Sequence, residues 1–278
     1  MGIKDPDRSV LTQFEEKIQF WDGRYELSLP WKDPHPVLPT NYQLCLKRLH
    51  GLFHRLQQNP SLLEEYDTII QNQVQQRIVQ PVEDSEATET ENVHYLPHHA
   101  VVRQDKETTK LRIVYDASAK STGPSLNDCL HTGPKFDQRI LDILLRFRTH
   151  RVALIADIEK AFLNVSMSEK DRDVLRFLWY DDITKKQPEV RVFRFTRVVF
   201  GISSSPFLLN ATISHHLRKH STSQPQLVRN LSQATYVDDI VTGANDEDSA
   251  YKLYTESKEL LKGGGFNLRK FVTSSGRL

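Results

Sequence analysis

The sequence has few cysteines and no long apolar segment. Only two of its 278 residues are cysteines, Cys45 and Cys129, and their wide separation argues against a disulfide framework and for a reducing compartment. No apolar run approaches the roughly 18 residues of a membrane-spanning helix. The first residues, M-G-I-K-D-P-D, lack the apolar region of a signal peptide. We therefore expect a cytoplasmic protein with no signal peptide and no membrane partner.

The chain also lacks an excess of charge of one sign. Lysine and arginine number 37, aspartate and glutamate 36, and the formal net charge is +1. This balance neither predicts nor excludes a nucleic-acid partner, so any basic surface must be local. Hydrophobic residues make up 38% of the chain, which is enough for a sizeable core. The length suits one large domain or two modest ones.

An acidic stretch divides the chain into two parts. Residues 83–91, E-D-S-E-A-T-E-T-E, hold five acids and no base, which predicts a solvated loop and a hinge. Before it, apolar residues at helical spacing and one alternating stretch predict helices around a short extended piece. From Asn92 onward, strand-like, turn-like and helix-like segments follow one another. We expect a mainly helical extension over residues 1–90 and a mixed domain over residues 91–278.

The most informative stretch is 234–241, which reads A-T-Y-V-D-D-I-V. Asp238 and Asp239 lie between two short β-favouring runs, which predicts a tight hairpin with both carboxylates at its tip. Adjacent carboxylates repel each other, and Mg²⁺ prefers hard oxygen ligands of this kind. The tip is therefore a candidate metal site for displacement at phosphorus. The alternative is a solvated turn without a ligand.

Three further aspartates follow strand-like segments. Residues 152–157, V-A-L-I-A-D, read as a buried strand ending in Asp157, a charge that is costly to bury unless it reaches solvent or a metal. Asp157 as the cap of a helix over 158–164 is the alternative. Asp181 and Asp182 precede a polar run containing a proline, which predicts an ordinary open loop between strands 174–180 and 190–195.

Cations gather on a predicted β-hairpin. Residues 93–103 and 111–115 read as two strands joined by the polar turn 104–109. Arg103, Lys106, Lys110 and Arg112 cluster on this hairpin. From the spacing alone, a phosphate-binding surface and a solvated face are equally consistent with the cluster.

Four segments together resemble the reverse transcriptases of LTR retroelements, and their sequences are most similar to those of the Pao/BEL group. They are L-R-I-V-Y-D-A-S (111–118), A-D-I-E-K-A-F (156–162), F-G-I-S-S-S-P-F (200–207) and Y-V-D-D (236–239). Each is weak alone, but their order and spacing make the set specific. The resemblance covers about residues 92–275. It implies an RNA-directed DNA polymerase of a retrotransposon with an α+β fold, the fingers and palm of a right-hand polymerase, and an antiparallel palm sheet packed on helices.

The resemblance also implies roles for individual residues. Asp157, Asp238 and Asp239 would be catalytic and, with the backbone of Ile158, would hold two Mg²⁺ ions, with Mn²⁺ as an alternative. Phe162 would stack under the incoming sugar, and Lys270 would protonate the leaving pyrophosphate. The other residues implied to bind nucleotide are Arg103, Arg112, Phe200 and Gly201, and those implied to contact template or primer are Asp116, Ser205, Pro206 and Tyr236.

The implied partners are an RNA or DNA template, a primer strand and deoxynucleoside triphosphates, in a parent element that forms virus-like particles. Self-association is left open. Two departures from the family pattern affect this interpretation. Phe200 stands where retroviral enzymes usually have glutamine, and the sequence ends before the primer-grip hairpin, thumb, connection and RNase H of the family.

Two alternatives follow. The chain could be a catalytically inactive truncated or domesticated remnant that only binds nucleic acid or a partner. The missing thumb favours this interpretation and the complete set of aspartates opposes it. The other alternative is an RNA-dependent RNA polymerase, which Phe162 disfavours because its ring would clash with a ribose 2′-hydroxyl.

Overall fold

The computed structural model describes residues 5–83, 92–102, 111–136 and 139–276, which form two compact units. Unit 1 comprises residues 1–27, 133–166 and 206–278, and unit 2 comprises residues 28–132 and 167–205. The predicted hinge lies within unit 2, and most of it falls outside the described residues. The two units follow from how the residues pack, so they do not test the predicted division into an extension over residues 1–90 and a mixed domain over residues 91–278. That division remains a prediction.

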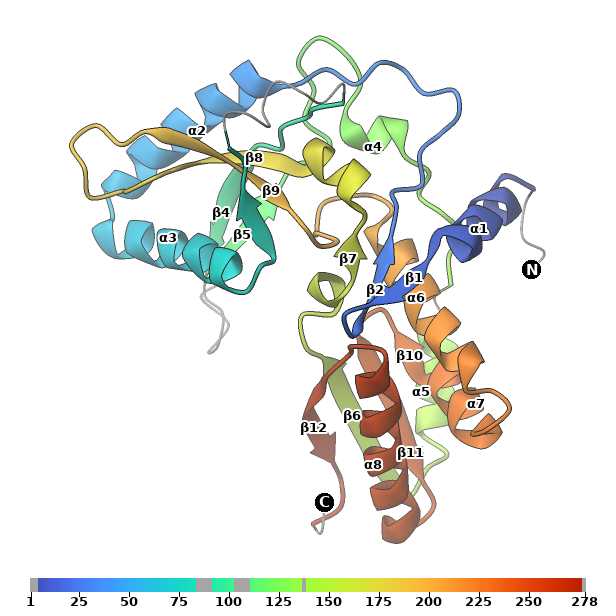
Figure 1. The fold of residues 1–278 in the computed structure, drawn as a ribbon. Coiled ribbons are helices and arrows are strands. Elements are labelled where there is room, and N and C mark those ends of the chain that lie inside the picture. The colour runs from blue at the N-terminus through green and yellow to red at the C-terminus, as the bar shows by residue number, and fades with distance from the viewer. Residues whose placement is uncertain (1–4, 84–91, 103–110, 137–138, 277–278) are drawn as a thin grey trace. The chain divides into compact units, whose positions relative to one another are not determined.

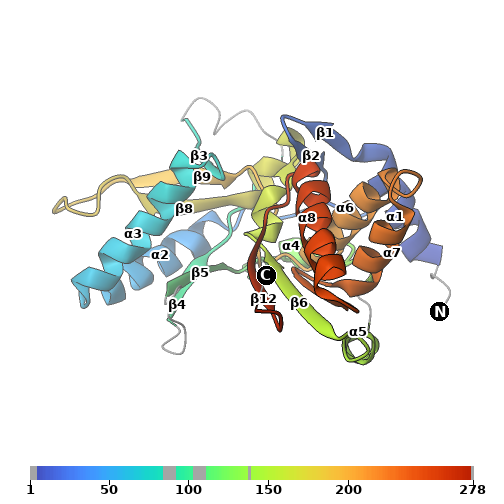
Figure 2. The ribbon, with the colours of Figure 1, turned by 90° about the horizontal axis from the view of Figure 1, so that it is seen from below.

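Unit 1 is built on a four-stranded antiparallel sheet with the order β10-β11-β6-β12 (Figure 1). The strands are β6 (Val152–Ile158), β10 (Thr235–Tyr236), β11 (Asp239–Ala244) and β12 (Leu268–Thr273). Along β6, buried and half-buried residues alternate strictly, because successive side chains point to opposite faces of the sheet. Figure 2 shows β6 and β12 side by side, as their register requires.

Helices pack on this sheet. α8 (Glu247–Gly263) contacts β6, β11 and β12, whereas α5 (Ile140–Phe147) and α7 (Pro225–Ala234) contact β11. The remaining elements of unit 1 are α1 (Asp5–Lys17), β1 (Gln19–Trp21), β2 (Arg24–Leu27), the 3₁₀ helix η1 (Ala161–Asn164) and all but the first residue of α6 (Ser205–Lys219).

A buried histidine links three of these elements. His216 of α6 donates from Nε2 to the carbonyl of Leu260 in α8 at 2.7 Å. Its Nδ1 therefore accepts from the hydroxyl of Tyr25 in β2, at 3.0 Å. Burial lowers the pKa of His216, which favours the neutral ring that this pattern requires. The N-terminal hairpin is thus tied to the helices beside the sheet.

Unit 2 contains a three-stranded antiparallel sheet and a separate two-stranded ladder. The sheet has the order β3-β9-β8, with β3 (Val79–Pro81), β9 (Val190–Phe195) and β8 (Arg176–Tyr180), and the ladder pairs β4 (His98–Val102) with β5 (Leu111–Tyr115). Helices of this unit are α2 (Tyr42–Gln57), α3 (Pro60–Gln75), α4 (Leu126–Cys129) and the 3₁₀ helix η2 (Glu169–Leu175). β7 (Ser166–Met167) lies where the chain passes from unit 1 to unit 2.

The core of unit 2 holds a buried ionic group. Arg176 is fully buried, and its Nε donates to Asp173 Oδ1 at 2.8 Å. Arg194 of β9 donates from NH1 to both carboxylate oxygens of Asp173, at 3.1 and 3.3 Å. One buried carboxylate therefore serves two buried guanidinium groups and joins η2, β8 and β9.

The structure confirms a mixed α+β fold, with two differences from the predicted strands. β4 begins at His98 and not at residue 93, since Pro97 lacks an N–H for the ladder. β8 begins at Arg176 because η2 takes up Val174 and Leu175. Among the residues that the structure describes, no helix is both long and apolar enough to cross a membrane.

Candidate active site

Two neighbouring strands of unit 1 bring the three candidate aspartates together. In the β6–β11 ladder, Asp157 is the direct partner of Asp239. Asp238 lies in the turn that precedes β11, and its backbone oxygen accepts from the Ile158 N–H at 2.8 Å. Asp157 is the second-to-last residue of β6, one residue before the strand end and not at it as predicted, and its alternative role as a helix cap is wrong because the next helix, η1, starts after Lys160.

The hairpin that carries the aspartate pair differs by one residue from the prediction. Tyr236 pairs with Asp239, so the two turn residues are Val237 and Asp238, and Asp239 already belongs to the strand. Val237 has a φ of 55°, a conformation that costs a β-branched residue on the order of 1–3 kcal/mol. The sequence offers no glycine here, so the hairpin keeps this strain beside Asp238.

The carboxylates influence each other electrostatically. The pKa of Asp239 is raised, first because burial disfavours its charge and then because Asp238 and Asp157 repel it, while Lys270 opposes the shift. The pKa values of Asp181 and Asp182 are instead lowered. Lys185 lowers the pKa of Asp181, and Thr184 lowers that of Asp182. The pair after β8 is thus the ordinary loop that was predicted, whereas at β11 the pKa of Asp239 is raised.

Two consecutive cations of β12 lie against Asp157. Arg269 Nε is 3.5 Å and Lys270 Nζ is 4.0 Å from Asp157 Oδ2. Lys270 was predicted as a site residue and Arg269 was not. Arg269 is the ladder partner of Asp157, but no motif in the sequence indicates which residue of β12 holds that position.

The three carboxylates are oxygen ligands of the kind that a hard divalent cation prefers. Three carboxylates share one end of the sheet, and the pKa of Asp239 is raised by burial and then by repulsion from the other two, so a divalent cation would relieve that repulsion. Within the described ranges, no three histidine, cysteine, aspartate or glutamate side chains already converge as a metal site. Holding an ion among these residues would therefore require side-chain movement, and the Asp157 side chain is 28% exposed.

Three further predicted site residues of unit 1 are close in sequence to the aspartates. Ile158 and Phe162 are both buried, Ile158 as the last residue of β6 and Phe162 within η1. Tyr236 is half-buried on β10, directly opposite Asp239.

Unit 2 holds a second group of predicted residues around the end of β5. Asp116 follows β5 and accepts from Arg48 NH1 at 2.8 Å. Gly201 has a φ of 100°, and a Cβ at this position would lie 2.1 Å from the Tyr115 oxygen. Only glycine fits this close approach. Asn127, which the sequence did not indicate, holds the turn by donating to the Gly201 oxygen and accepting from the Ser203 N–H.

The remaining members of this group are less constrained. Arg112 is exposed on β5, and Phe200 is 56% exposed next to Gly201. Ser205 is buried and donates to the Val199 oxygen at 2.7 Å. Pro206, the next residue and the first of the last segment of unit 1, is exposed as the second residue of α6. Arg103, Lys106 and Lys110 lie outside the described residues.

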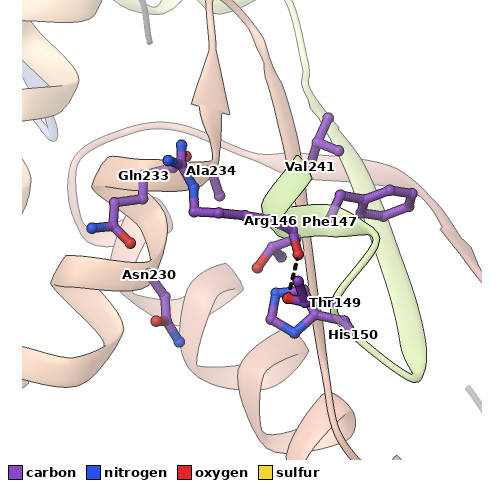
Figure 3. Close-up of a pocket in the computed structure, with 9 residues that line it drawn as sticks. Arg146, Phe147, Thr149, His150, Asn230, Gln233, Ala234 and Val241 are labelled. Carbon is purple, nitrogen blue, oxygen red and sulfur yellow. Dashed lines mark hydrogen bonds between the residues drawn. The ribbon is translucent and has the colours of Figure 1, made fainter. Parts of the chain in front are cut away.

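A pocket of about 190 Å³ lies elsewhere in unit 1, between α5, α7 and β11 (Figure 3). Arg146 crosses it and donates to the Gln233 carbonyl at 2.7 Å. The lining residues are Arg146, Phe147, Thr149, His150, Asn230, Gln233, Ala234, Val241 and Thr242. None of them is a predicted site residue, and none is one of the three aspartates.

Comparison with known families adds evidence independent of the geometry. A family model described as reverse transcriptase (RNA-dependent DNA polymerase) matches residues 62–271. This range exceeds half of the chain and contains all four segments quoted from the sequence. No curated protein matches the chain.

Proposed function

Because the chain belongs to the reverse transcriptase (RNA-dependent DNA polymerase) family, we propose that it adds deoxynucleotides to a primer 3′-hydroxyl on an RNA or DNA template. Primer, template and deoxynucleoside triphosphate are the partners that this family implies. The observation that carries the proposal is the register of β6 and β11. It sets Asp157 opposite Asp239, with Asp238 in the adjoining turn.

Each carboxylate has a distinct position in the proposed chemistry. Asp157 and Asp239 face each other from neighbouring strands, and Asp238 is fixed by the hydrogen bond from Ile158 to its backbone oxygen. Together with the Ile158 carbonyl, they would hold two Mg²⁺ ions, with Mn²⁺ as an alternative. Ions bound there would act as Lewis acids on the primer hydroxyl and the triphosphate. The protein's part is positioning and charge, as phosphoryl transfer generally requires.

We assign unit 1 to the palm of a right-hand polymerase and unit 2 to its fingers. The antiparallel sheet with helices packed on it supports the palm assignment. The β4–β5 ladder with exposed Arg112 supports the fingers assignment, because a guanidinium on such a ladder suits triphosphate oxygens. The four sequence segments support descent from an LTR retroelement of the Pao/BEL type.

The remaining predicted residues have proposed contacts in this scheme. Arg103, Arg112 and Lys270 would neutralise the triphosphate, with Lys270 as the proton donor to pyrophosphate. Phe162, Phe200 and Gly201 would line the nucleotide. Asp116, Ser205, Pro206 and Tyr236 would contact template or primer.

Single-nucleotide extension of an annealed primer tests the proposal. We expect the purified chain to extend the primer with a matched deoxynucleotide and Mg²⁺ on both RNA and DNA templates. Binding should weaken with salt, because most contacts would be to phosphates. Salt-sensitive binding of primer–template without any extension would contradict the proposal. That result would favour an inactive, nucleic-acid-binding remnant.

Phe162 provides a prediction about sugar selection. Phe162→Val is expected to lower the ratio of kcat/KM for deoxynucleotide over ribonucleotide by about tenfold or more, because the valine leaves space that a 2′-hydroxyl can occupy. Deoxynucleotide use should fall only modestly. The measurement is single-turnover extension with each nucleotide, comparing wild type and variant on one template.

Phe136 gives a matched control for this substitution. It is an aromatic residue of unit 1 that stacks on Phe207 with ring centroids 5.9 Å apart, and it has no proposed role at the sugar. Phe136→Val should leave the selectivity ratio unchanged. An equal ratio in wild type and an active, folded Phe162→Val variant would assign Phe162 to the core alone.

A further inference from the structure

Arg269 bridges two carboxylates beside the proposed metal site. Its NH1 donates to Glu159 Oε1 at 2.7 Å, and its Nε lies 3.5 Å from Asp157 Oδ2. The contact with Glu159 is thus short and the contact with Asp157 is loose. The planar guanidinium reaches the two acids through different nitrogens, NH1 and Nε.

The anchor on the Glu159 side is itself fixed. Asn267 Nδ2 donates to Glu159 Oε2 at 2.8 Å, and the backbone N–H of Glu159 donates to the backbone carbonyl of Asn267 at 2.8 Å. Both carboxylate oxygens of Glu159 are therefore engaged, one by Asn267 and the other by Arg269. Arg269 can release Asp157 and still remain tethered to Glu159.

A bulge in β12 gives Asp157 a second cation. Arg269 pairs with Asp157 and Val272 with Ile155, so β12 has one residue more than β6 across this interval. Lys270 lies within the bulge and has a φ of 50°, which is strained for a residue other than glycine. Because of the bulge, consecutive side chains approach the same oxygen instead of pointing to opposite faces. The two contacts differ, since Lys270 is 4.0 Å away and 60% exposed, against 40% for Arg269.

We propose that Arg269 is an internal counter-cation of the carboxylate cluster. Held by Glu159, its guanidinium offsets the negative charge of Asp157 and must withdraw from Asp157 when that carboxylate becomes a metal ligand. Arg269 is thus a positioning residue that competes with divalent ions and weakens their binding. This role rests on the proposed function, because it requires Asp157 to be a metal ligand.

Divalent-ion affinity tests this role without any catalytic turnover. Mn²⁺ binding to the full chain is measured by the loss of the free-ion electron paramagnetic resonance signal. Arg269→Gln is expected to lower the Mn²⁺ dissociation constant about two- to fivefold, the range expected when one partly exposed charge contact is removed. Arg269→Lys keeps a cation near Asp157 and should stay closer to the wild-type value. Lys270→Gln should have a smaller effect than Arg269→Gln.

One further variant and a second measurement separate local from general effects. Arg229→Gln makes the same substitution at an exposed position of α7 and should leave the dissociation constant unchanged. In thermal unfolding, added Mg²⁺ should raise the melting temperature of Arg269→Gln more than that of wild type, because the variant lacks the internal cation. Circular dichroism checks that each variant is folded.

The outcomes distinguish this inference from the function on which it rests. If wild type binds Mn²⁺, Asp238→Asn loses that binding, and Arg269→Gln binds no tighter than Arg229→Gln, then the role of Arg269 is wrong and the metal site stands. If wild type binds no Mn²⁺, or Asp238→Asn binds as well as wild type, the metal site itself is wrong and the role of Arg269 fails with it.

Discussion

Asp238→Asn is expected to lower kcat for primer extension by at least about 10²–10³-fold, the usual loss when one preorganised electrostatic group is removed from an active site. The substitution keeps the size of the side chain and its turn but removes a negative charge from the proposed metal site. The backbone oxygen of Asp238 can still accept from Ile158, so the hairpin should keep its position. Loss of activity would therefore reflect lost charge and not lost structure.

The chain contains a matched control for this substitution. Asp182 belongs to the other aspartate pair, and its Oδ1 accepts from the Thr184 N–H and hydroxyl. The amide oxygen of asparagine can replace that acceptor, so Asp182→Asn should extend primers at the wild-type rate. Both variants are compared in single-nucleotide extension with Mg²⁺. Wild-type kcat in Asp238→Asn would remove this residue from the catalytic set.

Stability gives an independent check on the same variant. Burial and, after it, the charge of Asp238 raise the pKa of Asp239, and a carboxyl group with a raised folded-state pKa makes the protein less stable as pH rises through that pKa. Removing the charge of Asp238 should therefore leave the melting temperature at neutral pH, in EDTA, equal to or above that of wild type. This advantage should disappear in acid, where Asp239 is protonated in both proteins. An inactive variant with an undiminished melting temperature cannot be explained by unfolding.

The sequence predicted which aspartates lie on neighbouring strands better than it predicted the hairpin turn next to them. The order of Asp157, Asp238 and Asp239 along the chain indicated one cluster, and the strands bring Asp157 and Asp239 opposite each other. The turn was misassigned by one residue because a two-residue turn usually takes residues that tolerate positive φ, and valine is a poor one. Val237 adopts this conformation nonetheless, held by the pairing of Tyr236 with Asp239.

Arg269 and Asn127 could not have been found in the sequence. Arg269 reaches Asp157 because β12 pairs with β6 across more than 100 positions of the chain and carries a bulge at Lys270. Asn127 reaches the turn at Gly201 from a separate segment. Neither residue lies in a recognisable motif, and long-range register is not encoded in local spacing. By contrast, Gly201 lies in one of the four quoted segments, and the structure places it where only glycine fits so close to the Tyr115 oxygen.

The buried ionic group of unit 2 supports the second large prediction. Asp173→Asn is expected to lower the free energy of unfolding by about 3–5 kcal/mol, since breaking a buried pair leaves uncompensated charge in the core. Arg176 is 0% and Arg194 8% exposed, so neither guanidinium can turn to water without disrupting its strand. A typical domain has only about 5–15 kcal/mol in total, so unit 2 should lose a large share of its stability.

Urea unfolding measures this loss. The indole of Trp179, which is fully buried in unit 2 and donates to Asp67 Oδ1 at 2.8 Å, reports the transition by fluorescence. Glu189→Gln is the matched control, because its ion pair with Arg191 is 3.1 Å long and exposed on both sides. An exposed pair contributes at most about 1 kcal/mol, so this variant should unfold close to the wild-type midpoint.

A triple substitution distinguishes lost pairing from lost packing. Replacing Asp173, Arg176 and Arg194 together by leucine, methionine and methionine removes every charge of the group while keeping apolar volume. Since burying charges is itself costly, such a core should recover most of the stability that Asp173→Asn loses. If Asp173→Asn instead unfolds within about 1 kcal/mol of the Glu189→Gln control, the two guanidinium groups find other acceptors. Asp173 would then not be the residue that joins η2, β8 and β9.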